Sequence, residues 1–176
     1  ADALSVSPVA AVLGSPIIYL KKDGSLDSAT KNYLASIKGK VKKAYVIGGD
    51  GVISNNMMKT VASTIGLKYG ATISRLAGQT RYETCVAVNN QFANVLTGPS
   101  LGLATGQDFP DALAGGVFAA STKSALFLVN TGFKTPKLLD FQTDYLKDKK
   151  AKRFFVFGGT GVLSDAAAEQ VRTTSR

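Results

Sequence analysis

The chain contains no histidine and no tryptophan, and its single cysteine is Cys85. The absence of histidine excludes Ser-His-Asp triads, imidazole acid–base chemistry and histidine-bound metals. One cysteine forms neither an intramolecular disulfide nor a zinc cluster, so we expect no metal and no cofactor. Cys85 falls in an apolar helical stretch, where we expect an inert buried thiol. No apolar run approaches the length of about 18 residues that a membrane-spanning helix needs, so we expect no membrane span.

Acidic residues are also scarce, because 12 aspartates and glutamates face 21 lysines and arginines, giving a formal net charge of +9. This balance favours a polyanionic partner. With 176 residues, of which 45% are hydrophobic, the chain suits one medium domain or two small ones. Residues 1–14 lack an initial methionine, a charged start and a cleavage pattern. We interpret them as the interior of a domain in a fragment or processed product, and not as a signal peptide.

An internal repeat organises the chain. Residues 2–20 align without a gap on 111–129, and VIGGDGVIS (46–54) matches VFGGTGVLS (156–164), at an offset of about 110 residues. The segment 71–110 has no earlier counterpart. We therefore predict the carboxyl-terminal portion of one repeat at 1–65, a connection at 66–70 and a complete repeat at 71–176.

Helical and strand patterns alternate through both repeats. We predict helices at 2–13, 26–38, 54–65, 80–94, 110–121, 135–149 and 164–174, and strands at 16–20, 44–48, 101–106, 124–129 and 153–159. Thr80 and Glu83 form a capping-box pattern, Pro110 suits a first helical turn, and Ser164 suits an N-cap. Apolar strands without alternation, set between helices, indicate an α/β fold with a layered parallel sheet covered on both faces.

Glycine-rich turns follow two of the predicted strands. The pattern GGxGxxS comprises Gly48, Gly49, Gly51 and Ser54, and again Gly158, Gly159, Gly161 and Ser164. Such a turn ahead of a helix offers free N–H groups to an anion. It matches neither the dinucleotide fingerprint nor the phosphate loop of nucleotide hydrolases. A compact structural turn with a capping serine is the alternative interpretation.

Two aspartates, Asp108 and Asp111, lie together at the start of the predicted helix 110–121. A carboxylate pair of this kind serves acid–base chemistry or holds Mg²⁺. The alternative is structural, with Asp111 favouring the helix dipole and Asp108 acting as a cap.

Basic residues cluster before two predicted strands. Lys40, Lys42 and Lys43 correspond through the repeat to Lys150, Lys152 and Arg153. Equivalent turns on both repeats suit a polyanion with repeating charges, although solvated lysine-rich turns are common. We expect both clusters at the amino edge of the sheet, opposite the glycine turns.

Two arginines, Arg75 and Arg81, flank the segment RLAGQTR. We retain both as candidate polymer-binding residues. A structural role is the favoured interpretation, with one of them paired to Glu83 or to an aspartate.

Three motifs, in this order, resemble the cell wall binding repeat 2 family: RLAGQTRYET (75–84), ATGQDFPDALAGGVFAA (104–120) and FGGTGVLSDAAAEQV (157–171). Members of this family occur on surface and S-layer-associated proteins of Gram-positive bacteria. The resemblance covers 71–174 and, through ADALSVSPVAAVLGSPII and VIGGDGVIS, residues 1–65. Two departures are visible. Thr80 replaces an aspartate of the family, and the family's PILL segment, implicated in anchoring, is Pro16–Tyr19 in one repeat and Ala125–Leu128 in the other. These apolar residues are expected to be buried.

The resemblance implies a Toprim-like α/β module, usually in tandem sets of three that pack as a pseudo-trimer. It also implies secretion and non-covalent anchoring to an anionic polysaccharide or teichoic-acid-like polymer of the cell wall, alongside other repeats of the same parent protein. Catalysis, where present, lies on a separate domain.

Three functional hypotheses therefore stand. The first is a non-catalytic anchor to an anionic wall polymer. The second is a structural module of a surface lattice, which self-associates without polymer. The third is a phosphate-handling hydrolase that uses Asp108 and Asp111, against which the missing histidine and phosphate-loop lysine weigh. Nucleic acid is not expected as a partner, because no stacking aromatic motif is interleaved with the basic residues.

Overall fold

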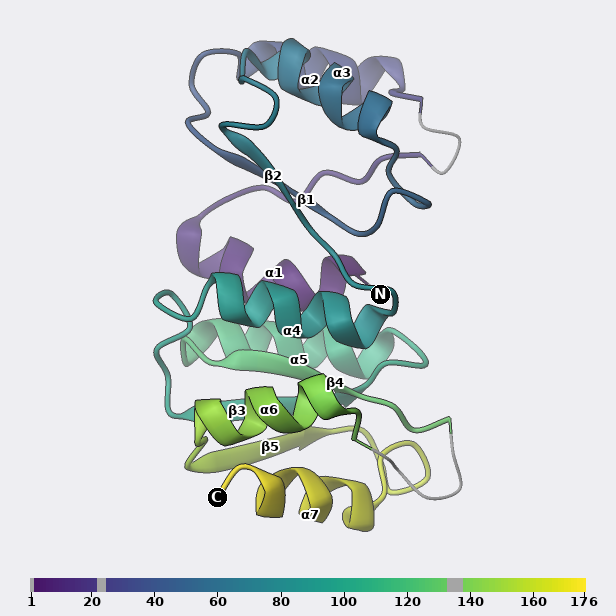
Figure 1. Ribbon diagram of the computed structural model, residues 1–176, viewed down its shortest axis with the longest axis vertical. Helices are drawn as coiled ribbons and strands as arrows, with labels where there is room; N and C mark the ends of the chain where they lie inside the picture. Colours follow the sequence, from purple (N-terminus) through teal and green to yellow (C-terminus); the bar gives the residue numbers. More distant parts are fainter. Residues whose placement is uncertain (1, 22–24, 133–137) are drawn as a thin grey trace. The chain divides into compact units, whose positions relative to one another are not determined.

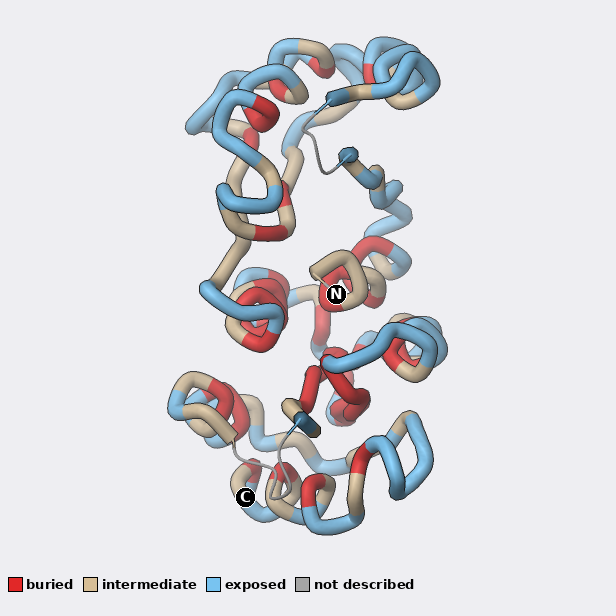
Figure 2. The backbone as a smooth tube through the Cα atoms, turned by 90° about the vertical axis from the view of Figure 1, so that its right-hand side faces the viewer, coloured by how far each residue is buried: buried red, intermediate tan, exposed pale blue. Residues whose placement is uncertain are grey.

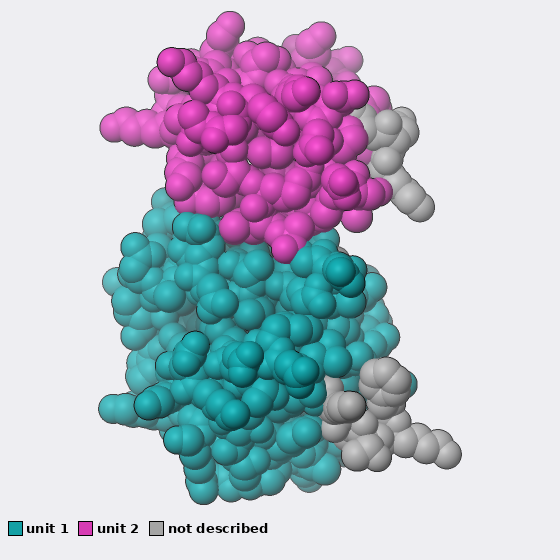
Figure 3. Space-filling view, viewed as in Figure 1, with its two compact units in different colours: residues 1–17, 78–176 teal, residues 18–77 magenta. Residues whose placement is uncertain are grey.

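Two compact units are present in the computed structural model, which describes residues 2–21, 25–132 and 138–176 (Figure 3). The large unit comprises residues 1–17 and 78–176, and the small unit comprises residues 18–77. The helices are α1 (Asp2–Leu13), α2 (Ser28–Ser36), α3 (Asn55–Ile65), α4 (Arg81–Gln91), α5 (Pro110–Ser121), α6 (Asp140–Lys149) and α7 (Asp165–Thr174). The strands are β1 (Ala44–Ile47), β2 (Ile73–Leu76), β3 (Ser100–Thr105), β4 (Ala125–Val129) and β5 (Arg153–Phe157).

The large unit contains a three-stranded parallel sheet in the order β4-β3-β5 (Figure 1). Leu101 of β3 lies opposite Ala125 on one side and Phe154 on the other. Every residue of β3 and β4 is buried (Figure 2), which confirms the parallel α/β fold. The chain moves from the central strand β3 to β4 at one edge of the sheet, and then from β4 back across β3 to β5 at the other edge. Right-handed crossovers therefore place α5 and α6 on opposite faces of the sheet.

Small residues allow α5 to pack closely on the sheet. A Cβ atom on Gly115 would lie 2.7 Å from Cδ2 of Phe157. The ring of Phe118 lies 4.5 Å from that of Phe155 and 5.6 Å from that of Phe157, centroid to centroid. The glycine therefore brings the helix backbone down to the aromatic surface of β5.

The first helix, α1, packs in the large unit against α4 and α5. Its Val6, Val9 and Ala10 are buried. A Cβ atom on Gly116 of α5 would lie 2.3 Å from Oγ of Ser7. Through the repeat, Ser7 is the counterpart of Gly116, so equivalent positions of two equivalent helices meet.

The small unit pairs β1 with β2 in parallel, with Ala44 opposite Ile73 and Ile47 opposite Leu76. Its core is formed by Val46, Met58, Ala62 and Ile73. Helix α3 begins at the cap Ser54, whose side chain accepts a hydrogen bond from Met57 N, and ends at Gly66 in the left-handed conformation.

The predicted helix starts are largely confirmed. Thr80 and Glu83 form a capping box, Pro110 lies in the first turn of α5, and the Ser164 side chain caps α7. The first residues of the predicted helix 135–149 fall outside the described residues, and the described helix begins at Asp140.

The predicted strand at 16–20 is wrong, because these residues are irregular. Its counterpart β4 pairs with β3, and β3 has no counterpart in the partial repeat, so the segment lacks a hydrogen-bonding neighbour. The expected burial of Pro16–Tyr19 fails for the same reason, with Tyr19 75% exposed, whereas Ala125–Leu128 are buried as expected. Strand β2 was not predicted.

Unit boundaries differ from repeat boundaries. The small unit ends at Ala77, and α1 belongs to the large unit together with most of the complete repeat. The predicted repeat segments are 1–65, 66–70 and 71–176, and their boundaries do not coincide with those of the compact units. The assignment of these segments therefore stays a prediction. In the described part of the chain, no helix has the length and apolar character needed to cross a membrane.

Candidate functional site

The carboxyl end of the large sheet carries a small pocket. Ligands of open α/β sheets favour this end, where strand connections diverge. The pocket measures about 130 Å³ and is lined by Leu4, Arg81, Gly106, Gln107, Asp108 and Phe109. It is smaller than the 300–1,000 Å³ or so typical of drug-sized ligands, and is therefore suited to a single chemical group.

Arg81 and Asp108 bring one positive and one negative side chain to this pocket. Arg81 is exposed, and its Nη1 donates to the carbonyl of Gly106 at 2.6 Å. Helix α4 begins at Arg81 and α5 at Pro110, so the positive ends of two helix dipoles lie at the pocket rim. The arrangement is suited to a carboxylate or phosphate group.

A polar network stabilises the loops beside the pocket. Gln107 Nε2 donates to the Tyr82 hydroxyl at 2.8 Å and to Asn130 Oδ1 at 3.0 Å. Thr105 Oγ1 and Thr131 Oγ1 are 2.7 Å apart. Burial raises the pKa of Tyr82, so its hydroxyl stays neutral. Sequence reasoning missed this network, although Gln107 and Asn130 each follow the end of a buried strand, which is the signal that marks it.

The two aspartates occupy different positions. Asp108 lines the pocket and accepts a hydrogen bond from Phe109 N at 2.8 Å. The N-cap of α5 is Phe109, without a side-chain cap bond, so the capping interpretation of Asp108 is wrong. Asp111 lies beside the glycine turn, where a Cβ atom on Gly158 would be 2.7 Å from its Oδ2. Within the described residues, no group of three or more histidine, cysteine or acidic side chains forms a metal cluster.

Hydrogen bonds from Arg75 stabilise the glycine turn of the small unit. Its guanidinium donates to the carbonyls of Gly48 and Ile53, both at 2.7 Å, and to Asn55 Oδ1 at 3.1 Å. The expected pairing of Arg75 or Arg81 with an acidic side chain is wrong, because among the described residues both arginines bind carbonyl and amide oxygens.

Both glycine turns have the same geometry. Gly48 and Gly158 each have φ of +122°, a conformation that side chains rarely adopt. Ser54 and Ser164 cap the following helices. Within the turns, Ile53 N donates to Gly49 O and Leu163 N to Gly159 O. These bonds favour the structural interpretation of Gly48, Gly49, Gly51, Gly158, Gly159 and Gly161.

The basic turns lie at the amino ends of β1 and β5, whereas the glycine turns follow the carboxyl ends of the same strands. Lys40, Lys42 and Lys43 precede β1, Lys150, Lys152 and Arg153 lie at the start of β5, and all six are exposed. Lys43 Nζ lies 4.9 Å from the centre of the Tyr45 ring. The one ion pair found among the described residues joins Arg172 to Glu169, so no carboxylate neutralises either turn.

Cys85 is unsuited to chemistry. It is 1% exposed, and its thiol donates to Leu126 O at 3.2 Å. Burial raises the pKa of the thiol to about 11. The prediction of a buried thiol is confirmed.

These features define a class of protein: a repeated parallel α/β binding module with exposed cations and a small polar pocket. Residues 1–58 and 75–168 match the family described as Cell wall binding domain 2 (CWB2), and the chain belongs to this family.

The chain is also similar to two curated relatives and to two solved structures. The chain is 29% identical over 176 residues to the N-acetylmuramoyl-L-alanine amidase LytC of Bacillus subtilis (strain 168), spanning 100% of this chain and 32% of LytC. It is 27% identical over 174 residues to the amidase enhancer of the same organism, spanning 99% of this chain and 21% of that protein. The chain thus spans a third or less of these relatives. Cwp6 and Cwp8 from Clostridium difficile share the fold. Cwp6 has a TM-score of 0.80 and is 22% identical, covering 98% of this chain and 25% of its own. Cwp8 has a TM-score of 0.76 and is 23% identical, covering 99% of this chain and 27% of its own.

Proposed function

We propose that this chain is a non-catalytic module that anchors a secreted surface protein to an anionic secondary polymer of the cell wall. The polymer is an anionic polysaccharide or a teichoic-acid-like chain. The observation that carries the proposal is a pair of equivalent, exposed basic turns: Lys40, Lys42 and Lys43 in one, and Lys150, Lys152 and Arg153 in the other. Among the described residues, neither turn forms an ion pair with a carboxylate. Family membership supports the wall as the target.

Attraction to the polymer is electrostatic in the first instance. The net charge of +9 raises the local concentration of a polyanion, and salt screens this effect beyond about 8 Å at physiological ionic strength. Two basic turns on one chain engage a repeating polyanion together, so weak contacts gain avidity.

Specific recognition is assigned to the pocket beside Arg81. Beyond its bond to the Gly106 carbonyl, the guanidinium has further N–H donors for which no partner is found in the part of the chain that the structure describes. An anionic group of the polymer binds Arg81 there, with Gln107 beside it, and the Asp108 carboxylate in the same lining opposes this binding. Arg75, whose donors already bind three oxygens of its own unit, stabilises the turn and does not contact polymer.

Further repeats of the parent protein act as partners. Phe109, Leu113 and Val117 form an exposed apolar stripe along α5, with 62%, 54% and 72% of their surfaces exposed. The counterparts of Leu113 and Val117 in α1 are Leu4 and Pro8, of which Pro8 is buried and Leu4 packs against the core. The helix of another repeat would cover the α5 stripe in the same way.

The experiment is a pull-down on purified walls, with and without extraction of the anionic secondary polymer, at low and high salt. We expect retention that requires the polymer and weakens as salt rises. Replacing Lys40, Lys42 and Lys43 by glutamine should weaken retention severalfold. The matched control replaces Lys31, Lys59 and Lys68 of the same unit, which changes the net charge equally.

Equal retention on both walls, or equal losses in the two triple variants, would contradict the proposal. Self-association without polymer would favour a lattice role instead. Hydrolysis of wall polymer that is abolished by Asp111→Asn would favour an enzyme.

A further inference from the structure

Strands β1 and β5 are equivalent through the repeat, at an offset of 110 between Gly48 and Gly158. The two turns that follow them share φ of +122° at the first glycine and a serine cap. The two strands differ in their neighbours, because β1 pairs with β2 and β5 pairs with β3.

Hydrogen bonds identify the edge of β1 that β2 occupies. Ala44 N donates to Thr72 O and Gly48 N donates to Leu76 O. Because alternate residues of a parallel strand point their N–H and C=O groups to the same side, the even-numbered residues of β1 face β2.

The same reasoning identifies the edge of β5 that β3 occupies. Gly106 N donates to Val129 O, so the even-numbered residues of β3 face β4 and Leu101 faces β5. Leu101 lies opposite Phe154, and a residue of a parallel ladder bonds to the two neighbours of its opposite residue. Arg153 and Phe155 therefore face β3, and Phe154 and Val156 face away from it. No strand of the described residues occupies, on β5, the edge that β2 fills on β1.

Residues of β5 are more exposed than their counterparts in β1, as expected for a strand edge without a neighbour. Val46 of β1 is 6% exposed, and its counterpart Val156 is 44% exposed. Gly48 is buried and Gly158 is exposed. Gly158 N has no bond, among the described residues, to match that from Gly48 N to Leu76 O.

The contacts of Arg75 have counterparts beside this edge. The guanidinium of Arg75 binds Gly48 O, Ile53 O and Asn55 Oδ1. The corresponding residues are Gly158, Leu163 and Asp165. A carboxylate thus stands where the small unit has an amide, and Asp111 Oδ2 lies beside Gly158 as well. An arginine is favoured here more strongly than in the small unit.

We propose that the open edge of β5 is the docking site for a parallel strand of the β2 type, Ile-Ser-Arg-Leu, contributed by another repeat. The incoming arginine lies opposite Val156, as Arg75 lies opposite Val46, and binds Gly158 O, Leu163 O and the Asp165 carboxylate. The proposal rests on the repeat partnership proposed above and is independent of polymer binding.

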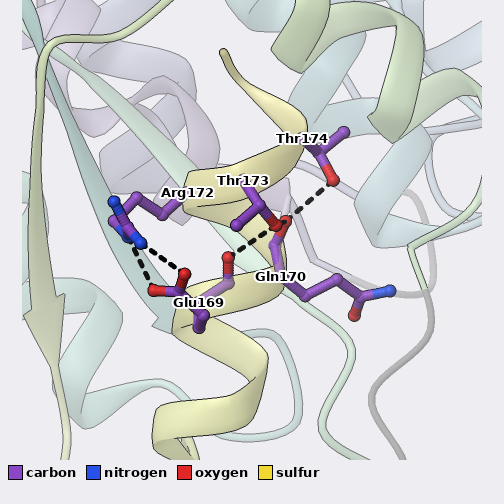
Figure 4. A network of polar contacts seen from close by, with 5 residues as sticks. All are labelled: Glu169, Gln170, Arg172, Thr173 and Thr174. Carbon is purple, nitrogen blue, oxygen red and sulfur yellow. Dashed lines mark hydrogen bonds and ion pairs between the residues drawn. The ribbon is translucent and has the colours of Figure 1, made fainter.

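A further difference between the two sites lies on the helix that follows each glycine turn. Ala62 of α3 is buried in a cluster with Ile73, and its counterpart in α7 is Arg172, which is paired with Glu169 (Figure 4). Charged side chains beside an open strand discourage unspecific pairing. The docked strand must therefore displace or cover the Arg172 side chain.

The test extends the full chain by a copy of residues 67–77, LKYGATISRLA, placed directly after Arg176. This position preserves the offset of 110. The N–H groups of Phe154, Val156 and Gly158 should then exchange with solvent about tenfold more slowly or better, because each gains an acceptor. The amide of the fully buried Leu103 serves as the internal reference.

Two matched variants sharpen the result. Alanine in place of the copied arginine should remove most of the protection, while Arg75 itself stays intact. Arg172→Ala, which restores the alanine of the small unit, should increase the protection. A chain extended by the same residues in scrambled order controls for length and composition.

Unchanged exchange of the three amides in the extended chain, or equal protection by the scrambled extension, would overturn the proposal. Concentration-dependent protection of the same amides in the unextended chain would overturn it too, since a second copy would then fill the edge. No polymer is present in these measurements, so a failure of polymer binding leaves their interpretation unchanged.

Discussion

Gly115 illustrates how one residue sets the spacing between a helix and its sheet. An added Cβ atom would lie 2.7 Å from Phe157 and 3.2 Å from Leu126. We expect Gly115→Ala to lower the free energy of unfolding by about 1–3 kcal/mol, because α5 must shift away from the sheet. Chemical denaturation measures this. Gly161→Ala, which meets nothing within 4 Å, is the control and should leave stability almost unchanged.

Cys85 is expected to be silent toward thiol reagents. The thiol is 1% exposed, and burial raises its pKa from 9.0 to about 11. Its reaction with a chromogenic disulfide at pH 8 should therefore be slow in the native protein and fast in denaturant. Rapid labelling without denaturant would contradict the burial.

The same thiol predicts a loss of stability in alkali. Because the folded-state pKa is the higher one, the thiol contributes stability that is complete below about pH 9 and is lost as the pH rises towards 11. Denaturation curves of the chain should fall more steeply over this range than those of Cys85→Ala. Parallel curves would contradict the assignment.

The candidate site was only partly predictable at the scale of residues. Arg81, Asp108 and the lysines were identified from spacing and charge, and the capping pair Thr80 and Glu83 from a local pattern. The bond from Arg81 to Gly106 O joins residues that are 25 positions apart, and no local pattern encodes it. The ion pairs expected for the arginines failed because the fold places backbone carbonyls at the ends of strands within bonding distance of each guanidinium.

At the scale of elements, long periodic segments were predictable and short ones were not. The seven described helices match predicted helices, and four of the five described strands match predicted strands. Strand β2 has four residues, of which only Ile73 is buried. Such a short segment has no repeating pattern of apolar residues from which a strand could be predicted. The strand predicted at 16–20 has the right composition and no partner, which sequence composition does not reveal.

Helix α1 is expected to be essential to the large unit. Val9 is 1% exposed where α1 packs against α4 and α5, whereas Leu13 at the end of the same helix is 50% exposed. We expect Val9→Asp to destabilise the large unit by about 3 kcal/mol or more, because it buries an unpaired charge. Leu13→Asp should cost less than about 0.5 kcal/mol. Thermal unfolding compares the two, and similar losses would contradict this role for α1.

At the scale of the whole molecule, the two units differ in how well their sheets are buried. Every residue of β3 and β4 is buried, but of β1 only Val46 is. We expect the small unit to open first on heating, and amides of β1 to exchange faster than those of β3. Ile73→Ala should lower only the first transition and Leu103→Ala only the second. One transition shifted equally by both variants would contradict independent unfolding.

The large unit is built from two separated stretches of chain, 1–17 and 78–176, and the small unit includes a strand from the head of the complete repeat. Any cut at 66–70 would take β2 away from β1. In evolutionary terms, gain or loss of repeats by unequal recombination keeps every helix and strand beside a suitable neighbour if one full period of about 110 residues is exchanged. The exchanged segment may then begin at any residue of the repeat. An array of repeats can therefore gain or lose one repeat while its terminal segments stay unchanged.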